Sequence, residues 1–223
     1  ASPDAVFVID DTTFPKQGRH SVGVQRQYCG ALGKKANCQA AVSVHYVAPK
    51  GHYPLAMELY LPEPRAADAD RLDRAGVPEE YRRNRTKGQI ALDLLDRVRA
   101  EGLPGRVVPA DAGYGASGEF RQGLADRGLY YLAGVTDEAV VFTAPPAWDR
   151  PAGRGGVGPA GGRPQSNPQL RPGSPRPARL RDLAARTPLR SATWRAGTKG
   201  PMSGRFAWVL VWPGFGWKRG VCA

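Results

Sequence analysis

The chain has 223 residues, of which 41% are hydrophobic, and a formal net charge of +12. That length is enough for one sizeable core, or for a core with an appended region. No run approaches the roughly 20 apolar residues of a membrane span, and no signal peptide is visible, so a membrane protein is not expected. The three cysteines form no Cys-x-x-Cys pair, which argues against a zinc ribbon or a disulfide framework and favours a reducing, cytoplasmic setting.

The positive charge is concentrated in the C-terminal part. Residues 1–142 hold 18 Lys and Arg against 18 Asp and Glu, whereas residues 143–223 hold 14 basic residues against only Asp149 and Asp182. Arg outnumbers Lys 25 to 7, which favours bidentate contacts with phosphate. The tail is therefore expected to bind a polyanion, although GC-rich coding also enriches Arg, and the charge is supporting evidence only.

The stretch Ala5-Val-Phe-Val-Ile-Asp10-Asp11-Thr12 runs five apolar residues directly into two carboxylates. The β-branched run predicts a buried strand that ends in an acid. Ligands and metals gather at the carboxyl ends of strands in α/β sheets, because side chains there leave the packed interior on a rigid backbone. Taken alone, this stretch is also compatible with a strand followed by an Asp-rich turn.

A second stretch, Arg106-Val-Val-Pro-Ala110-Asp111-Ala-Gly-Tyr-Gly115, repeats this design. Ser117 can cap the helix that follows, with Glu119 in its first turn. Acids at the ends of two neighbouring strands can meet in space and bind a hard cation such as Mg²⁺, which prefers oxygen ligands. The candidate chemistry is phosphoryl transfer or phosphodiester cleavage.

The other elements follow from hydrophobic periodicity. Strands are predicted over 22–28, 39–47, 53–61 and 129–135, with a hairpin over 30–37, and helices over 88–100 and 117–127. Hairpins followed by strand-helix alternation predict an α/β protein with a mixed sheet flanked by helices.

The region after residue 142 has a different composition. Residues 143–190 contain ten Pro and seven Gly, so we expect a basic linker with at most one short helix near 180–185. Four of the five Trp follow residue 190, and the apolar run from Phe206 to Trp212 predicts a strand. These Trp either stack on DNA bases or, more simply, pack a small sheet.

Two other site types are not supported. Gly33-Lys34 is not a phosphate-binding loop, because that motif needs a Gly at position 28, which is Tyr. Lys34 and Lys35 fit a solvated hairpin tip better than a DNA contact. Cys29, Cys38, His20 and His45 match no common spacing of metal ligands.

Several motifs together resemble the DDE transposases of bacterial insertion sequences, also described as DDE superfamily endonucleases. They are Val8-Ile-Asp-Asp-Thr-Thr-Phe-Pro-Lys16, Ser21-Val-Gly-Val-Gln-Arg-Gln-Tyr-Cys-Gly30, Gly33-Lys34 with Asn37-Cys-Gln39, Ala110-Asp-Ala-Gly-Tyr-Gly115 and Trp194-Arg-Ala-Gly-Thr-Lys-Gly-Pro201. The resemblance runs from residue 4 to about residue 215. It implies a ribonuclease-H-like core, whose catalytic acids follow strands one and four, and a catalytic Glu on a later helix, after a β-rich insertion.

The resemblance assigns Asp10 as the first catalytic and metal-binding acid and Asp111 as the second. Asp10 stands in the Asp-x-Thr context of the family, so Asp11 is the less favoured occupant of the first place. Only one of the two can face a metal, because neighbouring residues of a regular strand point to opposite faces. The implied domains are a partial ribonuclease-H-like core over 1–142, a Pro/Gly/Arg-rich linker over 143–190 and a truncated Trp-rich β insertion over 191–223.

The resemblance also leaves one acid missing. Glu119 and Glu138 are the only glutamates after Asp111, and both precede the insertion, so this chain contains no counterpart of the third catalytic Glu. The chain starts within a few residues of its first strand and without Met, and we interpret it as a segment of a longer protein. We therefore expect these 223 residues alone to be poorly active or inactive.

The family resemblance implies transposition of an insertion sequence by DNA strand cleavage and strand transfer. The implied cofactors are two Mg²⁺ or Mn²⁺ ions, and the implied partners are element-end and target DNA and further copies of the chain, with no membrane and no small-molecule substrate. One alternative is a remnant of a transposase that binds DNA without catalysis. Another is an aspartyl phosphatase, which needs Asp-x-Asp-x-Thr, whereas Asp10 and Asp11 are adjacent.

Overall fold

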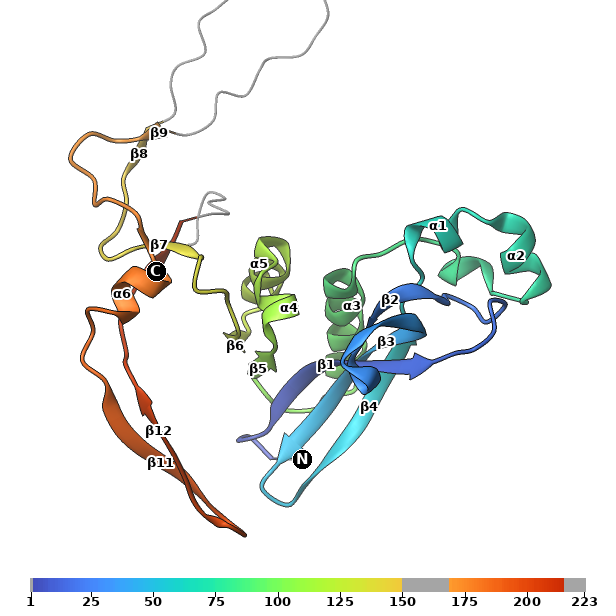
Figure 1. The fold of residues 1–223 in the computed structure, drawn as a ribbon, viewed down its shortest axis with the longest axis horizontal. Helices are drawn as coiled ribbons and strands as arrows, with labels where there is room; N and C mark the ends of the chain where they lie inside the picture. Colours follow the sequence, from blue (N-terminus) through green and yellow to red (C-terminus); the bar gives the residue numbers. More distant parts are fainter. Residues whose placement is uncertain (1, 150–168, 215–223) are drawn as a thin grey trace, which may run out of the picture. The chain divides into compact units, whose positions relative to one another are not determined.

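The computed structural model describes residues 2–149 and 169–214. These residues form two compact units, one of residues 2–135 and one of residues 136–214. Figure 1 shows the ribbon, with strands β1 to β6 and helices α1 to α5 in the first unit. In the described part of the chain, no helix is both long enough and apolar enough to cross a bilayer.

A six-stranded mixed sheet forms the centre of the first unit. Its strands are β1 (Val6–Pro15), β2 (Gln25–Cys29), β3 (Lys34–Ala48), β4 (Gly51–Leu59), β5 (Val107–Ala110) and β6 (Tyr130–Ala133). The order is β2-β3-β1-β5-β6, and β4 also pairs with β3. β1 is antiparallel to β3 and parallel to β5, and β5 is parallel to β6. The predicted α/β class with a mixed sheet is confirmed.

β1 continues through its two acids. Its register with β3 is unbroken over all ten residues, so the prediction that the strand ends at Asp10 and Asp11 is wrong. Thr12 and Thr13 follow, and β-branched residues suit a strand as long as a partner strand is present to pair with them. Because β1 is regular through both acids, the side chains of Asp10 and Asp11 lie on opposite faces of the sheet.

The turn between β2 and β3 is shorter than the predicted hairpin over 30–37. A single 3₁₀ turn spans Gly30–Leu32, and Gly33 has a φ of 63°, a left-handed conformation that favours glycine. β3 therefore begins at Lys34, and Lys34 and Lys35 pair with β2 instead of forming the hairpin tip. On its outer edge β3 pairs first with β2 and then with β4.

Helix α3 (Lys87–Ala100) begins at a capping box and confirms the predicted helix over 88–100. The Thr86 hydroxyl accepts a hydrogen bond from the Gln89 backbone N–H at 3.2 Å. The Gln89 side-chain oxygen accepts one from the Thr86 N–H at 2.9 Å. These reciprocal bonds satisfy two backbone donors and fix Lys87 as the first residue of the helix.

The core of the first unit lies between the sheet and helices α3 and α5 (Gly118–Asp126), which pack side by side (Figure 1). Phe7 and Ile9 of β1 are fully buried in it. The core also includes Val42, Val44, Ile90, Leu94, Leu95, Val108, Phe120 and Leu124. Each fully buried side chain of this kind contributes roughly 1.5–3 kcal/mol. Since residues two apart on a strand share a face, Asp11 lies on the same helix-covered face as Phe7 and Ile9.

A close backbone approach fixes the turn after β5. Helix α4 (Ala112–Gly115) is a single turn between β5 and α5. A Cβ added to Gly115 would lie 1.8 Å from the carbonyl oxygen of Gly134, which directly follows β6. Only glycine fits this position, which gives a structural reason for the Gly-Tyr-Gly sequence at residues 113–115.

The charged segment between β4 and α3 contains short helices. They are α1 (Glu63–Ala66), α2 (Ala69–Arg74) and the 3₁₀ turn η2 (Glu79–Tyr81). Leu61, Leu72 and Val77 form a small separate apolar cluster beneath them. This segment is therefore folded.

The second unit contains smaller elements. They are β7 (Val140–Phe142), β8 (Trp148–Asp149), β9 (Gln169–Leu170), β10 (Ala178–Arg179), α6 (Leu180–Ala184), β11 (Arg190–Gly197), β12 (Gly200–Phe206) and β13 (Trp212–Pro213). β7 pairs with β10 and β13, β8 pairs with β9, and β11 forms a hairpin with β12. The α6 helix confirms the short helix predicted near 180–185.

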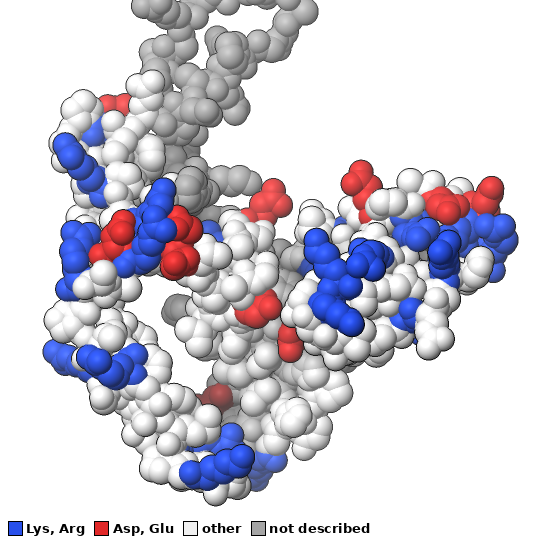
Figure 2. Space-filling model, viewed as in Figure 1, with Lys and Arg blue, Asp and Glu red and all other residues white. Residues whose placement is uncertain are grey.

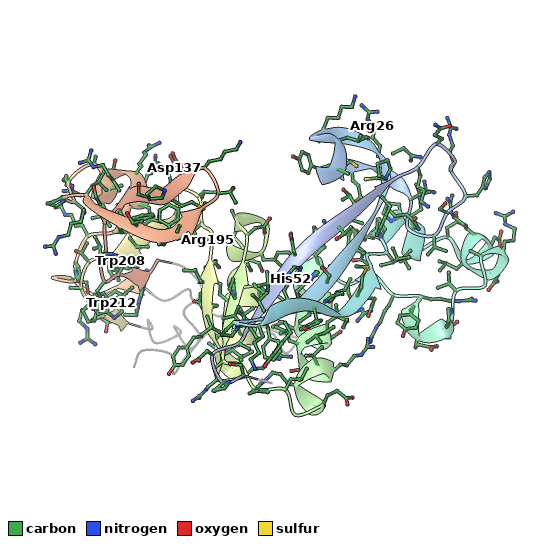
Figure 3. The ribbon with its side chains drawn as sticks, turned by 90° about the horizontal axis from the view of Figure 1, so that it is seen from below. Arg26, His52, Asp137, Arg195, Trp208 and Trp212 are labelled. Carbon is green, nitrogen blue, oxygen red and sulfur yellow. The ribbon has the colours of Figure 1, made fainter. Side chains whose placement is uncertain are left out.

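The hairpin β11–β12 is exposed over most of its length. Trp194 and Phe206 pack edge to face across it, with ring centroids 5.5 Å apart. Arg195 lies on this hairpin (Figure 3), and the space-filling view shows Lys and Arg gathered on it (Figure 2). No Asp or Glu lies between residues 183 and 223.

The strand predicted over 206–212 is wrong. β12 ends at Phe206, which pairs with Arg190 at the start of β11, so the next residues have no partner strand. Trp208 and Leu210 are 88% and 77% exposed. An apolar run becomes a strand only where its backbone groups find partners, and here only Trp212 and Pro213 pair, with β7.

The predicted domain limits stay a prediction. β7, which falls within the first 142 residues, pairs with strands of the second unit. Of the linker predicted over 143–190, residues 150–168 lie outside the described residues, and the rest includes β9, β10 and α6. Residues 215–223 of the predicted insertion also lie outside them.

Candidate functional site

Asp11 and Asp111 line one cavity of the first unit, with a volume of about 440 Å³. β1 and β5 are parallel neighbours, and Ile9 pairs with Ala110. Asp111 therefore follows β5 at the level where β1 carries its acids. The expected meeting of an acid from β1 with an acid after β5 is thus present in the structure, and the acid from β1 that lines the cavity is Asp11.

Asp111 is held by the start of α4. Its carboxylate accepts a hydrogen bond from the backbone N–H of Tyr114 at 3.2 Å and caps this single turn. A Cβ on Gly113 would come within 3.2 Å of the same carboxylate oxygen, so glycine leaves the carboxylate room. The side chain is exposed to solvent at the cavity, and its second oxygen is available for a ligand.

Asp11 is bound on both of its oxygens. The Tyr114 hydroxyl donates a hydrogen bond to Oδ1, and the Lys87 ammonium forms an ion pair with Oδ2. Asp11 and Lys87 side chains are 27% and 34% exposed, respectively. Three elements that are far apart in the sequence, β1, α3 and α4, therefore meet at this carboxylate.

Tyr114 acts as a neutral donor in this cluster. Its ring is buried and packs against Phe120, with the ring centroids 5.3 Å apart. Burial raises the pKa of Tyr114 above its ordinary value, and the hydrogen bond to Asp11 and the charges of the nearby carboxylates raise it further. The hydroxyl keeps its proton at neutral pH and orients the Asp11 carboxylate.

Asp10 does not line the cavity. Its carboxylate accepts a hydrogen bond from the backbone N–H of Asp11 at 2.8 Å, and its backbone carbonyl accepts one from the Ser43 hydroxyl at 3.1 Å. The side chain is exposed on the face of the sheet opposite to α3 and α5. The assignment of Asp10 as the first catalytic acid stays a prediction, and the geometry brings Asp11 to Asp111 instead.

Glu119, in the first turn of α5, also lines the cavity. The described residues nevertheless contain no group of three or more His, Cys, Asp and Glu side chains placed to hold a metal ion together. Asp11, Asp111 and Glu119 thus line one cavity without forming such a group. Glu138 pairs with Arg179 and Arg181 in the second unit.

Cys29, Cys38 and His45, whose spacing did not support a metal site, make local contacts. Cys29 and Cys38 are both buried as free thiols, and Cys29 lies 3.5 Å from the Thr13 hydroxyl. His45 shares a hydrogen bond with the Ser43 hydroxyl at 3.0 Å. These contacts provide the side chains with partners inside the sheet.

Sequence reasoning missed Lys87 and the role of Tyr114. Tyr114 lies within the glycine-flanked motif after Asp111, so its place beside the acid could have been inferred from that motif. Lys87 lies 76 residues from Asp11, and its only local signal was the Thr86-x-x-Gln89 capping box, which fixes where α3 begins.

The arrangement suits a hard divalent cation and a phosphate. Carboxylate oxygens are the ligands that Mg²⁺ and Mn²⁺ prefer, and such ions keep several waters and bind substrate phosphates. Asp11 and Asp111 carry such oxygens at the cavity, and Lys87 carries a positive charge there. Their placement on β1, α3 and the turn after β5 makes the site rigid.

Comparison with known proteins agrees with this chemistry. The family model described as DDE superfamily endonuclease matches residues 1–201. The chain is 32% identical over 141 residues to a protein of Microchaete diplosiphon named "Probable transposase for insertion sequence element IS701". That match covers 63% of this chain and 34% of the relative, so the matched part spans about a third of the relative's length. No solved structure matches the chain.

The matched region contains all five motifs that carry the resemblance in sequence, together with both acids of the cavity. It also extends over the whole mixed sheet of the first unit and into the hairpin of the second. Since the family model covers most of the chain, the chain belongs to the DDE superfamily endonucleases.

Proposed function

We propose that this chain is part of an insertion-sequence transposase that cleaves and joins DNA with the help of divalent metal ions. The observation that carries the proposal is that Asp11 and Asp111 line the same cavity. Membership of the endonuclease family and the name of the relative support the same reaction class. Asp11 and Asp111 act as the metal-binding carboxylates.

The core is proposed to be ribonuclease-H-like. Three antiparallel strands, β1, β3 and β4, precede a helix, and two parallel strands, β5 and β6, follow it. The path β4-β3-β1-β5-β6 within the sheet, with one acid on β1 and another directly after β5, supports this proposal. β2 is an additional strand on the outer edge of β3.

Asp11 is a better candidate than Asp10 for the first acid. Only one of two neighbouring residues of a regular strand can face the helices, and Asp11 shares that face with Phe7 and Ile9. The same geometry argues against the aspartyl phosphatase alternative, because a nucleophile and its acid partner have to reach one substrate. Asp10 and Asp11 point away from each other.

The proposed cofactor is Mg²⁺ or Mn²⁺, bound as two ions in the complete enzyme. When bound, such a pair activates a water or a 3′-hydroxyl and stabilises the leaving oxygen. The residues of this chain have simpler tasks. Asp11 and Asp111 provide oxygen ligands, and Tyr114 orients Asp11 through its buried hydroxyl.

The proposed partners are the DNA of the element ends and of the target, bound by more than one copy of the chain. The exposed basic hairpin of the second unit favours DNA as the partner. The same observation keeps DNA binding without catalysis as a second candidate function. The two candidates differ in whether the cavity binds metal and supports cleavage.

The test is to measure Mn²⁺ binding to the chain by calorimetry and its binding to duplex DNA at several salt concentrations. We expect Asp11→Asn and Asp111→Asn each to weaken Mn²⁺ binding by about tenfold or more, since each removes a charged ligand. Asp10→Asn is the matched control and should bind as the wild type does. Loss of binding in Asp10→Asn with retention in Asp11→Asn would assign the first acid to Asp10. Salt-sensitive DNA binding with no metal binding would favour the second candidate.

A further inference from the structure

The ion pair between Lys87 and Asp11 places a cation on the carboxylate that the proposed function assigns to metal binding. Resting on that function, we propose that Lys87 competes with the divalent ion for Asp11 and, once displaced, binds a phosphate of the DNA substrate at the same cavity. Lys87 would thus be a substrate-binding residue whose availability depends on the metal.

The start of α3 fixes the position of Lys87. It is the first residue of α3, and the capping box at Thr86 and Gln89 fixes the backbone there. The ammonium reaches Asp11 Oδ2 and lies 5.7 Å from the centroid of the Tyr60 ring. The side chain is 34% exposed, so its flexible stem can swing into the cavity without any movement of the helix.

The Asp11 carboxylate already has two partners. Tyr114 donates to Oδ1 and Lys87 to Oδ2, so both oxygens are engaged. Each carboxylate oxygen can accept more than one bond, and Tyr114 is neutral, so the tyrosine can stay when a cation binds. Lys87 is charged and repels a second cation at the same oxygen, so it has to leave.

The charged side chains that line the cavity are mostly acidic. Its wall carries the acids Asp11, Asp111 and Glu119, and Lys87 is the single basic side chain among the residues that line it. A phosphodiester entering this wall meets three negative charges unless cations screen them. A displaced Lys87 is then the one basic group of the lining that can contact the phosphate.

A purely structural ion pair predicts something different. If Lys87 only stabilised the fold, its removal would weaken metal binding and DNA binding together, or change neither. Competition followed by phosphate binding predicts opposite shifts, namely tighter metal binding and weaker DNA binding. The two explanations can therefore be separated without measuring cleavage.

The experiment uses the chain with Lys87→Met, Lys87→Arg and Arg97→Met. Arg97 is on the same helix, 64% exposed and outside the cavity, so it controls for the loss of one positive charge. Mn²⁺ affinity is measured by calorimetry. Affinity for a fluorescent DNA duplex is measured by anisotropy, once with Mn²⁺ and once with EDTA. Thermal unfolding by far-UV circular dichroism verifies that each variant is folded.

We expect Lys87→Met to bind Mn²⁺ about fivefold more tightly, the upper end for loss of a partly exposed ion pair. It should bind DNA about fivefold more weakly with Mn²⁺ and nearly as the wild type does with EDTA. Lys87→Arg keeps the charge and should resemble the wild type. Arg97→Met should leave Mn²⁺ affinity unchanged and affect DNA binding equally in both conditions.

Unchanged or weaker Mn²⁺ binding in Lys87→Met, with wild-type binding that depends on Asp11 and Asp111, overturns the inference alone. So does a loss of DNA affinity that is the same with Mn²⁺ and with EDTA. Mn²⁺ binding that is absent from the wild type, or indifferent to Asp11→Asn and Asp111→Asn, overturns the proposed function and this inference with it.

Discussion

The two units of this chain differ in the size of their buried core and in their net charge. Residues 1–135 hold 18 basic and 16 acidic residues, and the buried core of the described chain lies almost wholly within the first unit. Residues 136–223 hold 14 basic and 4 acidic residues. Figure 2 shows both signs of charge on the first unit and a predominance of Lys and Arg on the hairpin of the second. The buried core that can hold side chains in fixed positions thus lies in the first unit. Most of the excess positive charge, which attracts a polyanion, lies in the second.

This division suits the proposed chemistry. A metal site needs ligands held within fractions of an ångström, which the packed sheet and helices provide for Asp11 and Asp111. Attraction to a DNA backbone needs charge but little fixed geometry, because phosphates repeat along the duplex. The exposed hairpin β11–β12 carries four basic residues and no acidic residue, which is enough for such attraction.

The largest difference between the units should appear on truncation of an apolar side chain. Leu94 is fully buried between α3 and the sheet, whereas Leu210 is 77% exposed in the second unit. We expect Leu94→Ala to cost about 2–5 kcal/mol through lost burial and a cavity. Leu210→Ala should change stability by less than about 0.5 kcal/mol.

The chain contains its own probe for this comparison. All five Trp follow residue 142, so Trp fluorescence reports on the second unit and far-UV circular dichroism is dominated by the first. Leu94→Ala should lower the midpoint of denaturant unfolding seen by circular dichroism and leave the fluorescence transition in place. A common shift of both transitions would show that the two units unfold together, contrary to this division.

A second test concerns the backbone that supports Asp111. A Cβ at Gly115 would collide with the Gly134 carbonyl, so Gly115→Ala should cost about 1–3 kcal/mol by overpacking and displace Tyr114. Gly118→Ala is the matched control, because the nearest atom to its Cβ is the end of the Arg121 side chain at 3.9 Å. Alanine favours a helix over glycine by up to about 1 kcal/mol, so the control should be neutral or stabilising. Denaturant midpoints measure both.

A third test removes two positive charges from either unit and compares the loss of DNA affinity. The double variant Arg195→Gln with Lys199→Gln should weaken binding to duplex DNA by roughly tenfold and lower the salt dependence by about two counterions. The matched variant Lys34→Gln with Lys35→Gln removes two exposed charges from a unit that is nearly neutral, and its effect should be smaller. Anisotropy titrations at several salt concentrations measure both. Equal effects would contradict the assignment of DNA attraction to the second unit.

Local signals predicted much of the first unit. The apolar runs around Phe7 and Val108 are strands, and the periodic run of Ile90, Leu94 and Val98 is a helix, because burial on one face requires that spacing. Asp111 was placed at the end of its strand, and the parallel pairing of β1 with β5 confirmed the neighbourhood that the sequence suggested. These features depend on near neighbours in the chain.

Features that depend on distant partners could not be predicted. β1 extends past its acids because β3 is long enough to pair with it, and the run after Phe206 is irregular because β11 starts at Arg190. That Asp11 and not Asp10 lines the cavity follows from which face of the sheet the helices cover. The contact of Lys87 with Asp11 joins residues 76 apart and has no local signature.

The smallest difference should appear at the helix starts of the two units. Ser117 caps α5 by accepting a hydrogen bond from the Phe120 N–H at 3.2 Å, whereas Arg179 at the start of α6 provides no side-chain cap. Ser117→Ala should cost about 1 kcal/mol through the lost cap, seen as a lower midpoint by circular dichroism. Arg179→Ala loses only an exposed ion pair with Glu138 and should cost less than about 0.5 kcal/mol by Trp fluorescence. A cost for Arg179→Ala as large as that for Ser117→Ala would mean that ion pairing stabilises the second unit where the first relies on hydrogen bonds and a core.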